Sequence, residues 1–88
     1  GSLSLLSEYL GKIGFTETEG KNLMNSFYAI QTLRSTGAAH RKGSEYEEAL
    51  RRYDLINLTN RDRFSKLLSD LTVSLNTISL RIRQSFPS

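Results

Sequence analysis

The stretch from 33 to 43 holds the residues whose types and spacing could support chemistry. It contains Arg34 and, after five intervening residues, His40, the only histidine of the 88-residue chain; Arg41 and Lys42 follow at once. An imidazole accepts or donates a proton near neutral pH, and a guanidinium offers a fork of permanently charged donors to phosphate oxygens. These residue types suit cleavage of an RNA phosphodiester, because the 2′-hydroxyl of RNA supplies the nucleophile.

Each of these residues would have its own role in that reaction. His40 would be the general base or general acid for the 2′-hydroxyl or the leaving 5′-oxygen. Arg34 would stabilise the charge of the pentacoordinate phosphorane, and Arg41 and Lys42 would attract the RNA backbone. Such a reaction needs no metal ion or other cofactor. A single histidine in a chain without cysteine also argues against a zinc site.

Simpler roles remain open for both central residues. Arg34 falls on the extension of an apolar helical stripe, so its stem could pack while its guanidinium reaches water at the helix end. His40 could cap a helix or lie in solvent. On a continuous helix, six residues leave two side chains about 120° apart and ~9 Å apart along the axis. The pair therefore meets only if the backbone turns near Gly37 or if a second copy completes the site across a two-fold axis.

Helical periodicity accounts for the rest of the chain. Apolar residues recur at spacings of three and four in four segments, and no segment shows the two-residue alternation of strands. The four stripes are Leu3, Leu6, Leu10 and Ile13; Leu23, Phe27 and Ile30, widened by Met24 and Leu33; Tyr46, Ala49, Leu50 and Tyr53; and Phe64, Leu68, Leu71, Leu75, Ile78 and Ile82. They predict an all-α fold, a small four-helix bundle, whose last helix carries a continuous packing seam.

Polar residues and glycines predict where these helices begin and end. Two capping boxes are expected, one from Thr16 to Glu19 and one from Ser44 to Glu47. Gly14 is expected just after the first helix, and Thr59 or Asn60 should cap the last. Near the C-terminus, Arg81 and Arg83 are interpreted as partners of the negative end of the last helix dipole.

Length and composition bound the class of protein. Residues 3–88 suit a single helical domain; Gly1-Ser2 resembles a tag remnant, which suggests a piece excised from a larger protein. The absence of cysteine fits a reducing, cytoplasmic setting, and no apolar run reaches the ~20 residues that cross a bilayer. The net charge is +3, and its excess begins at Arg34. That balance suits RNA as a partner.

At these residues the chain resembles the HEPN superfamily of small helical domains. The pattern that defines the family is an Arg, four to six residues and a His at the end of a helix, followed by further helices. Here it reads Leu33-Arg34-Ser35-Thr36-Gly37-Ala38-Ala39-His40-Arg41-Lys42-Gly43, as in HEPN-type domains of bacterial defence and toxin proteins. The family commonly has Asn, Asp or His directly after the Arg, where this chain has Ser35.

The resemblance implies a HEPN-like bundle that forms a homodimer around the motif and cleaves RNA without a metal, leaving a cyclic phosphate. Arg34 and His40 would be the catalytic pair; Ser35, Arg41 and Lys42 would bind substrate, the serine through a hydrogen bond. Such a domain would belong to a larger antiviral defence or toxin protein. The alternative is a non-catalytic helical module that dimerises or docks a neighbouring domain, with or without RNA binding.

Overall fold

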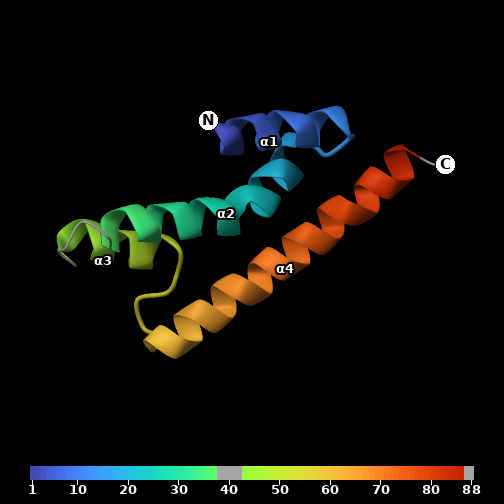
Figure 1. Cartoon of the computed structure of the whole chain (residues 1–88). Coiled ribbons are helices and arrows are strands. Elements are labelled where there is room, and N and C mark those ends of the chain that lie inside the picture. The colour runs from blue at the N-terminus through green and yellow to red at the C-terminus, as the bar shows by residue number, and fades with distance from the viewer. Residues whose placement is uncertain (38–42, 87–88) are drawn as a thin grey trace.

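The all-α prediction is confirmed by the computed structural model, which describes residues 1–37 and 43–86. These residues form four helices and no strand: α1 (Ser2–Lys12), α2 (Glu17–Gly37), α3 (Ser44–Arg52) and α4 (Asn60–Ser85). The three principal helix–helix interfaces all involve α2, which packs against α1, α3 and α4 (Figure 1). The bundle is elongated, with extents of 48 × 25 × 20 Å.

Capping interactions define most of the helix ends as predicted. The Thr16 hydroxyl accepts a hydrogen bond from the Glu19 amide, and the Glu19 carboxylate accepts one from the Thr16 amide. The bond from the Thr16 amide lowers the pKa of the Glu19 carboxyl below its ordinary value. Thr59 caps α4 by accepting a hydrogen bond from the Asp62 amide. Gly14 follows α1 with φ +102°, a conformation that favours glycine.

The capping box predicted at Ser44 is wrong. The structure places Gly43 at the N-cap of α3, in an extended conformation and with no side-chain cap, so Ser44 is already the first helical residue. Within α3, Glu47 and Arg51 form an exposed ion pair of 3.8 Å. An exposed pair of this kind contributes at most a few tenths of a kcal/mol.

The main core lies where α1, the start of α2 and the end of α4 meet. It is built from Leu10, Ile13, Phe15, Met24 and Ile78, with Leu3, Leu6, Tyr9, Leu23, Phe27 and Ile82 packed around them. A smaller set of buried residues belongs to α2, to α3 and to the segment after α3: Ala29, Ala49, Leu50 and Leu55. Of the stripe predicted for α1, Leu10 and Ile13 are buried, and Leu3 and Leu6 are partly buried against them.

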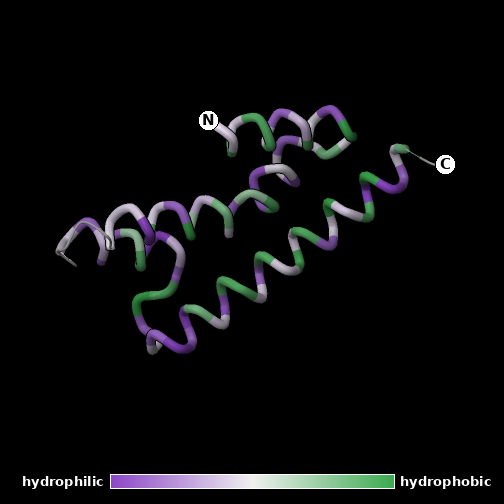
Figure 2. The backbone as a smooth tube through the Cα atoms, in the orientation of Figure 1, coloured by the Kyte–Doolittle hydropathy of each residue, from purple (hydrophilic) through white to green (hydrophobic). Residues whose placement is uncertain are grey.

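The seam predicted for α4 is only half covered. Ile78 is buried and Leu71 and Ile82 are partly buried, whereas Phe64, Leu68 and Leu75 are exposed. Hydrophobic residues recur along the whole of α4, including its N-terminal half, from which α2 diverges (Figures 1 and 2). The helical periodicity predicted the correct apolar stripe of α4, but the neighbouring helix α2 covers only one side of that stripe.

Arg81 has a different role from the one expected at the end of a helix dipole. Its guanidinium lies over the Phe15 ring, 4.0 Å from the centroid, and donates a 3.4 Å hydrogen bond to the Ile13 carbonyl. A Cβ atom at Gly14 would lie 3.1 Å from the same guanidinium. Arg81 therefore joins the end of α4 to the turn between α1 and α2. Within the described residues, no helix combines the length and hydropathy required to cross a membrane.

Replacing Arg81 with Met should lower the free energy of unfolding by about 1–2 kcal/mol, because Met keeps the aliphatic bulk but loses the hydrogen bond and the cation–π contact. Urea denaturation measures the change. Arg83→Met is the matched control: Arg83 is exposed in the last turn of α4, and its loss should change stability by less than about 0.5 kcal/mol. Equal effects of the two substitutions would contradict the role assigned to Arg81.

Candidate functional site

Arg34 lies in the last turn of α2 and borders an open cleft between α2, α3 and α4. The cleft has a volume of about 450 Å³. Its lining is mostly apolar, with two arginines and an asparagine: Leu33, Arg34, Gly37, Tyr46, Leu50, Asn60, Arg63, Phe64 and Leu67. Arg34 reaches it because Ile30, Leu33, Arg34 and Gly37 share one face of α2, at spacings of three and four.

The second arginine of the cleft is engaged by the backbone. Arg63 donates hydrogen bonds of 2.9 and 3.0 Å to the carbonyls of Leu55 and Ile56, and a third of 2.9 Å to the Asn60 side chain. These bonds hold the segment between α3 and α4, in which Asp54 adopts φ 59° and Leu55 is fully buried. Arg63 is therefore a structural residue with its donors largely occupied.

Arg34 differs from Arg63 in being exposed and in having no donor engaged by the described residues. Within residues 1–37 and 43–86 it makes no hydrogen bond and no ion pair, and no acidic residue lines its cleft. Arg34 is exposed and lines the cleft together with Leu33, which is compatible with the simpler interpretation of a residue that extends an apolar stripe. The same arrangement leaves a forked cationic donor available to an anion.

Gly37 allows α3 to approach the end of α2. A Cβ atom at this position would lie 3.3 Å from the Tyr46 ring, closer than nearly all real contacts of that kind. The ring of Tyr46 therefore packs over the C-terminal turn of α2 and forms a wall of the cleft. This close approach fixes α3 beside Arg34.

The other predicted site residues are not brought together by the described part of the chain. Ser35 is exposed on α2, about 100° around the helix from Arg34, and is not among the residues lining the cleft. His40, Arg41 and Lys42 lie outside the described residues. Nor do the described residues gather three or more acidic or imidazole groups that could hold a metal ion.

An apolar groove adjoins the cleft on the side toward the middle of α4. It has a volume of about 230 Å³ and is lined only by hydrophobic residues: Ile30, Leu33, Phe64, Leu67, Leu68 and Leu71. Leu33, Phe64 and Leu67 border both the groove and the Arg34 cleft, so the two are continuous. The exposed guanidinium thus lies at the end of an exposed hydrophobic surface.

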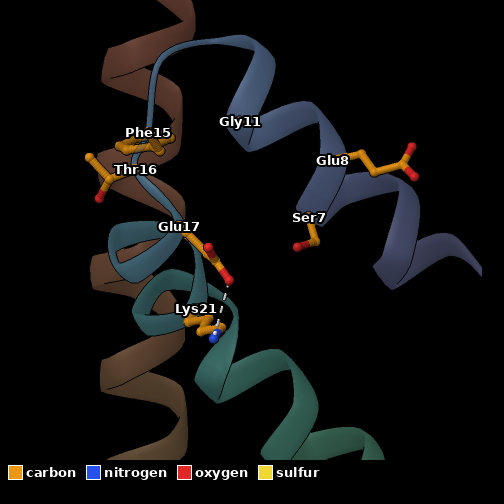
Figure 3. A pocket seen from close by; sticks show the side chains of 8 residues that line it. Ser7, Glu8, Gly11, Phe15, Thr16, Glu17 and Lys21 are labelled. Carbon is orange, nitrogen blue, oxygen red and sulfur yellow. Dashed lines mark ion pairs between the residues drawn. The ribbon is translucent and has the colours of Figure 1, made fainter.

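Two other depressions lie away from Arg34. One, of about 370 Å³, separates α1 from the start of α2 and contains the 3.4 Å Glu17–Lys21 ion pair (Figure 3). Lys21 is about 20 Å from Arg34 along the helix axis, too far to act at the same phosphate. The other, of about 240 Å³, is lined by Val73 and by polar residues of α2 and α4. One of these is the buried Ser26, whose hydroxyl has no hydrogen-bond partner among the described residues.

Sequence reasoning missed Arg63 and Tyr46 as neighbours of Arg34. Both come from other helices, and no local pattern links them to position 34. One sequence feature could have drawn attention to Arg63. It directly precedes Phe64, so its aliphatic stem is expected beside the apolar stripe of α4. Its partners, the carbonyls of Leu55 and Ile56, follow only from the tertiary path of the connecting segment.

The chain matches no protein-family model, and neither curated proteins nor solved structures give a significant match. The likeness to the HEPN superfamily therefore rests on the Arg-x5-His motif and the helical frame.

Replacing Arg63 should destabilise the protein more than replacing Arg34, although both residues line the same cleft. Arg63→Met should lower the free energy of unfolding by about 1.5–3 kcal/mol, because buried or partly buried carbonyls lose charged hydrogen-bond donors. Arg34→Met should change it by less than about 0.5 kcal/mol, because it breaks no interaction among the described residues. Urea denaturation of both variants decides the matter, and a loss at Arg34 equal to that at Arg63 would show an undetected structural role for Arg34.

Proposed function

We propose that this chain is a HEPN-like, metal-independent endoribonuclease domain of a cytoplasmic defence or toxin protein, active as a dimer, with Arg34 and His40 at the cleavage site. The observation that most strongly supports this proposal is the environment of the Arg34 side chain. Its guanidinium is exposed at the edge of a cleft that no acidic residue lines, and it has no partner among the described residues. A structural arginine would have partners, as Arg63 has.

The reaction proposed is an internal transfer of the phosphoryl group. The 2′-oxygen of the RNA attacks the adjacent phosphorus, the bond from phosphorus to the 5′-oxygen breaks, and a 2′,3′-cyclic phosphate and a free 5′-hydroxyl result. The proton of the 2′-hydroxyl passes to a general base, and the leaving 5′-oxygen acquires a proton from a general acid. His40 takes one of these roles, assigned by the motif because His40 lies outside the described residues.

Arg34 acts in this scheme through charge. The two non-bridging oxygens gain negative charge as the phosphorane forms, and a guanidinium donates to both in a forked arrangement. Arg41 and Lys42 add cationic charge near the motif and attract the RNA backbone in a salt-dependent way. Ser35 is positioned by α2 next to Arg34 in sequence and is exposed, so its hydroxyl is accessible to substrate.

A non-catalytic interaction module is the second candidate, because the apolar groove beside Arg34 is exposed. In that case Arg34 and its basic neighbours serve at most to bind RNA. Binding alone predicts an affinity that falls with salt and no reaction products. The two candidates therefore differ in whether RNA is cleaved.

Wild-type protein should cleave single-stranded RNA in the presence of EDTA, and Arg34→Ala and His40→Ala should each lower the rate by about 10²-fold or more. Labelled RNA separated on gels gives the rate, and the resistance of product 3′ ends to a ligase that needs a free 3′-hydroxyl tests for the cyclic phosphate. Arg83→Ala, a change of an exposed arginine at the far end of α4, should retain activity. Folding of each variant is checked by circular dichroism.

Absence of cleavage by a folded, dimeric wild type would contradict the ribonuclease proposal. Cleavage that persists in the His40→Ala and Arg34→Ala variants would do the same, since the activity would then come from other residues or from a contaminant. RNA binding without products would favour the second candidate.

A further inference from the structure

The cleft beside Arg34 is bordered by an aromatic ring that takes no part in the main core. Phe64 is 69% exposed, the largest exposed fraction among the large hydrophobic residues of the described chain. It lines the cleft and is absent from the core cluster. An exposed aromatic face at the mouth of a cleft is a surface on which a nucleobase can stack, because every base has a π-face.

The cleft also has the size and the lining of a site for a flat ring. Its volume of about 450 Å³ falls within the range of small-molecule sites, ~300–1,000 Å³. Leu33, Leu50 and Leu67 supply apolar walls. The ring of Tyr46, packed over Gly37, forms the side toward α3. Apolar walls with a few polar groups suit a planar ligand whose polar atoms lie at its edge.

The Asn60 side chain, another residue lining the cleft, has its orientation fixed by Arg63. The Arg63 guanidinium donates a 2.9 Å hydrogen bond to Asn60 Oδ1. An arginine has no acceptor, so the amide must present its oxygen to Arg63 and keep its NH2 group for another partner. Asn60 therefore offers N–H donors to a ligand in the cleft, while its oxygen is already engaged.

The amide and the ring lie on one face of α4, and Arg34 faces them from α2. Asn60 and Phe64 are four residues apart, a spacing that puts their Cβ atoms about 5–6 Å from each other. A base stacked on the Phe64 ring thus brings its edge to the Asn60 amide. Arg34 lines the same cleft, where its guanidinium can bind the phosphate next to that base.

The polar groups of this cleft distinguish the bases by one substituent. Guanine and uracil carry a carbonyl oxygen where adenine and cytosine carry an amino group. An N–H donor of Asn60 bonds to the carbonyl oxygen but meets another donor in the amino group. No acidic residue is among the described residues that line the cleft, so the amino group finds no carboxylate acceptor there. The cleft therefore favours a keto base.

We propose that the cleft between α2, α3 and α4 is a nucleobase site that takes a keto base, guanine or uracil, of single-stranded RNA. The base stacks on Phe64, the Asn60 amide donates to its carbonyl oxygen, and Arg34 binds the adjacent phosphate. The choice of RNA rests on the proposed function, which the inference deepens by naming the class of base beside the phosphate. The preference for a keto base rests on the cleft alone.

Binding is measured apart from cleavage, with 2′-O-methyl oligonucleotides whose 2′-oxygen is blocked as a nucleophile. Fluorescence anisotropy at one fixed salt concentration compares a uridine and a cytidine oligonucleotide, each about eight nucleotides long. These bases are both pyrimidines, and they differ in the carbonyl or amino group that the cleft is expected to read. The uridine oligonucleotide should bind at least about fivefold more tightly. Equal affinities, tighter binding of cytidine or no measurable binding overturns the inference.

Asn60→Asp changes the polarity of the base contact and keeps the bond to Arg63. One carboxylate oxygen still accepts from the Arg63 guanidinium, and an acidic residue is favourable in the first turn of a helix. The other oxygen now accepts where the amide donated. The ratio of uridine to cytidine affinity should fall at least about fivefold, whereas the added negative charge weakens both oligonucleotides alike. An unchanged ratio overturns the inference.

Substitutions at Phe64 test the stacking contact. Phe64→Leu keeps apolar bulk but removes the ring, and should weaken both oligonucleotides at least about fivefold. Phe64→Tyr, which restores a ring, should bind more tightly than Phe64→Leu. Phe86→Leu is the matched control, because Phe86 is 65% exposed but lies about 33 Å from Phe64 along the helix axis. Equal losses in Phe64→Leu and Phe86→Leu overturn the inference, and circular dichroism establishes that each variant is folded.

Cleavage of unmodified RNA by the same proteins separates this inference from the proposed function. Cleavage that depends on Arg34 and His40, together with equal affinity for uridine and cytidine, removes the base site and keeps the ribonuclease. A preference for uridine that is lost in Asn60→Asp, without any cleavage, does the reverse.

Discussion

The structure depends on the packing of three helices against a single one. Among the described residues, α2 forms the principal interface with each of α1, α3 and α4, so the other helices are held together mainly through it. The first part of α2 is covered by α1 and the end of α4, which makes the main core, and Arg81 holds that junction together through Phe15 and Ile13. Within residues 1–37 and 43–86, the last part of α2 has α3 and the diverging start of α4 beside it. The open end of the bundle and its exposed apolar groove follow from this arrangement.

Local sequence features predicted the elements well, because the interactions that define them lie within four residues. The capping of α2 by Thr16 and of α4 by Thr59 is of this kind, as is the glycine after α1. The box at Ser44 failed for an equally local reason. Gly43 takes an extended conformation at the N-cap and leaves Ser44 inside the helix, and nothing in the spacing distinguishes the two registers.

Periodicity could not predict which side of a stripe is covered. The α4 seam repeats regularly from Phe64 to Ile82, yet Ile78 is buried and Leu75 is exposed. The difference is set by the path of α2, which no spacing within α4 contains. For the same reason the sequence placed Arg34 on the apolar face of α2 but could not show that Arg63 and Tyr46 share its cleft. The approach of Tyr46 depends on Gly37, whose missing side chain admits the ring.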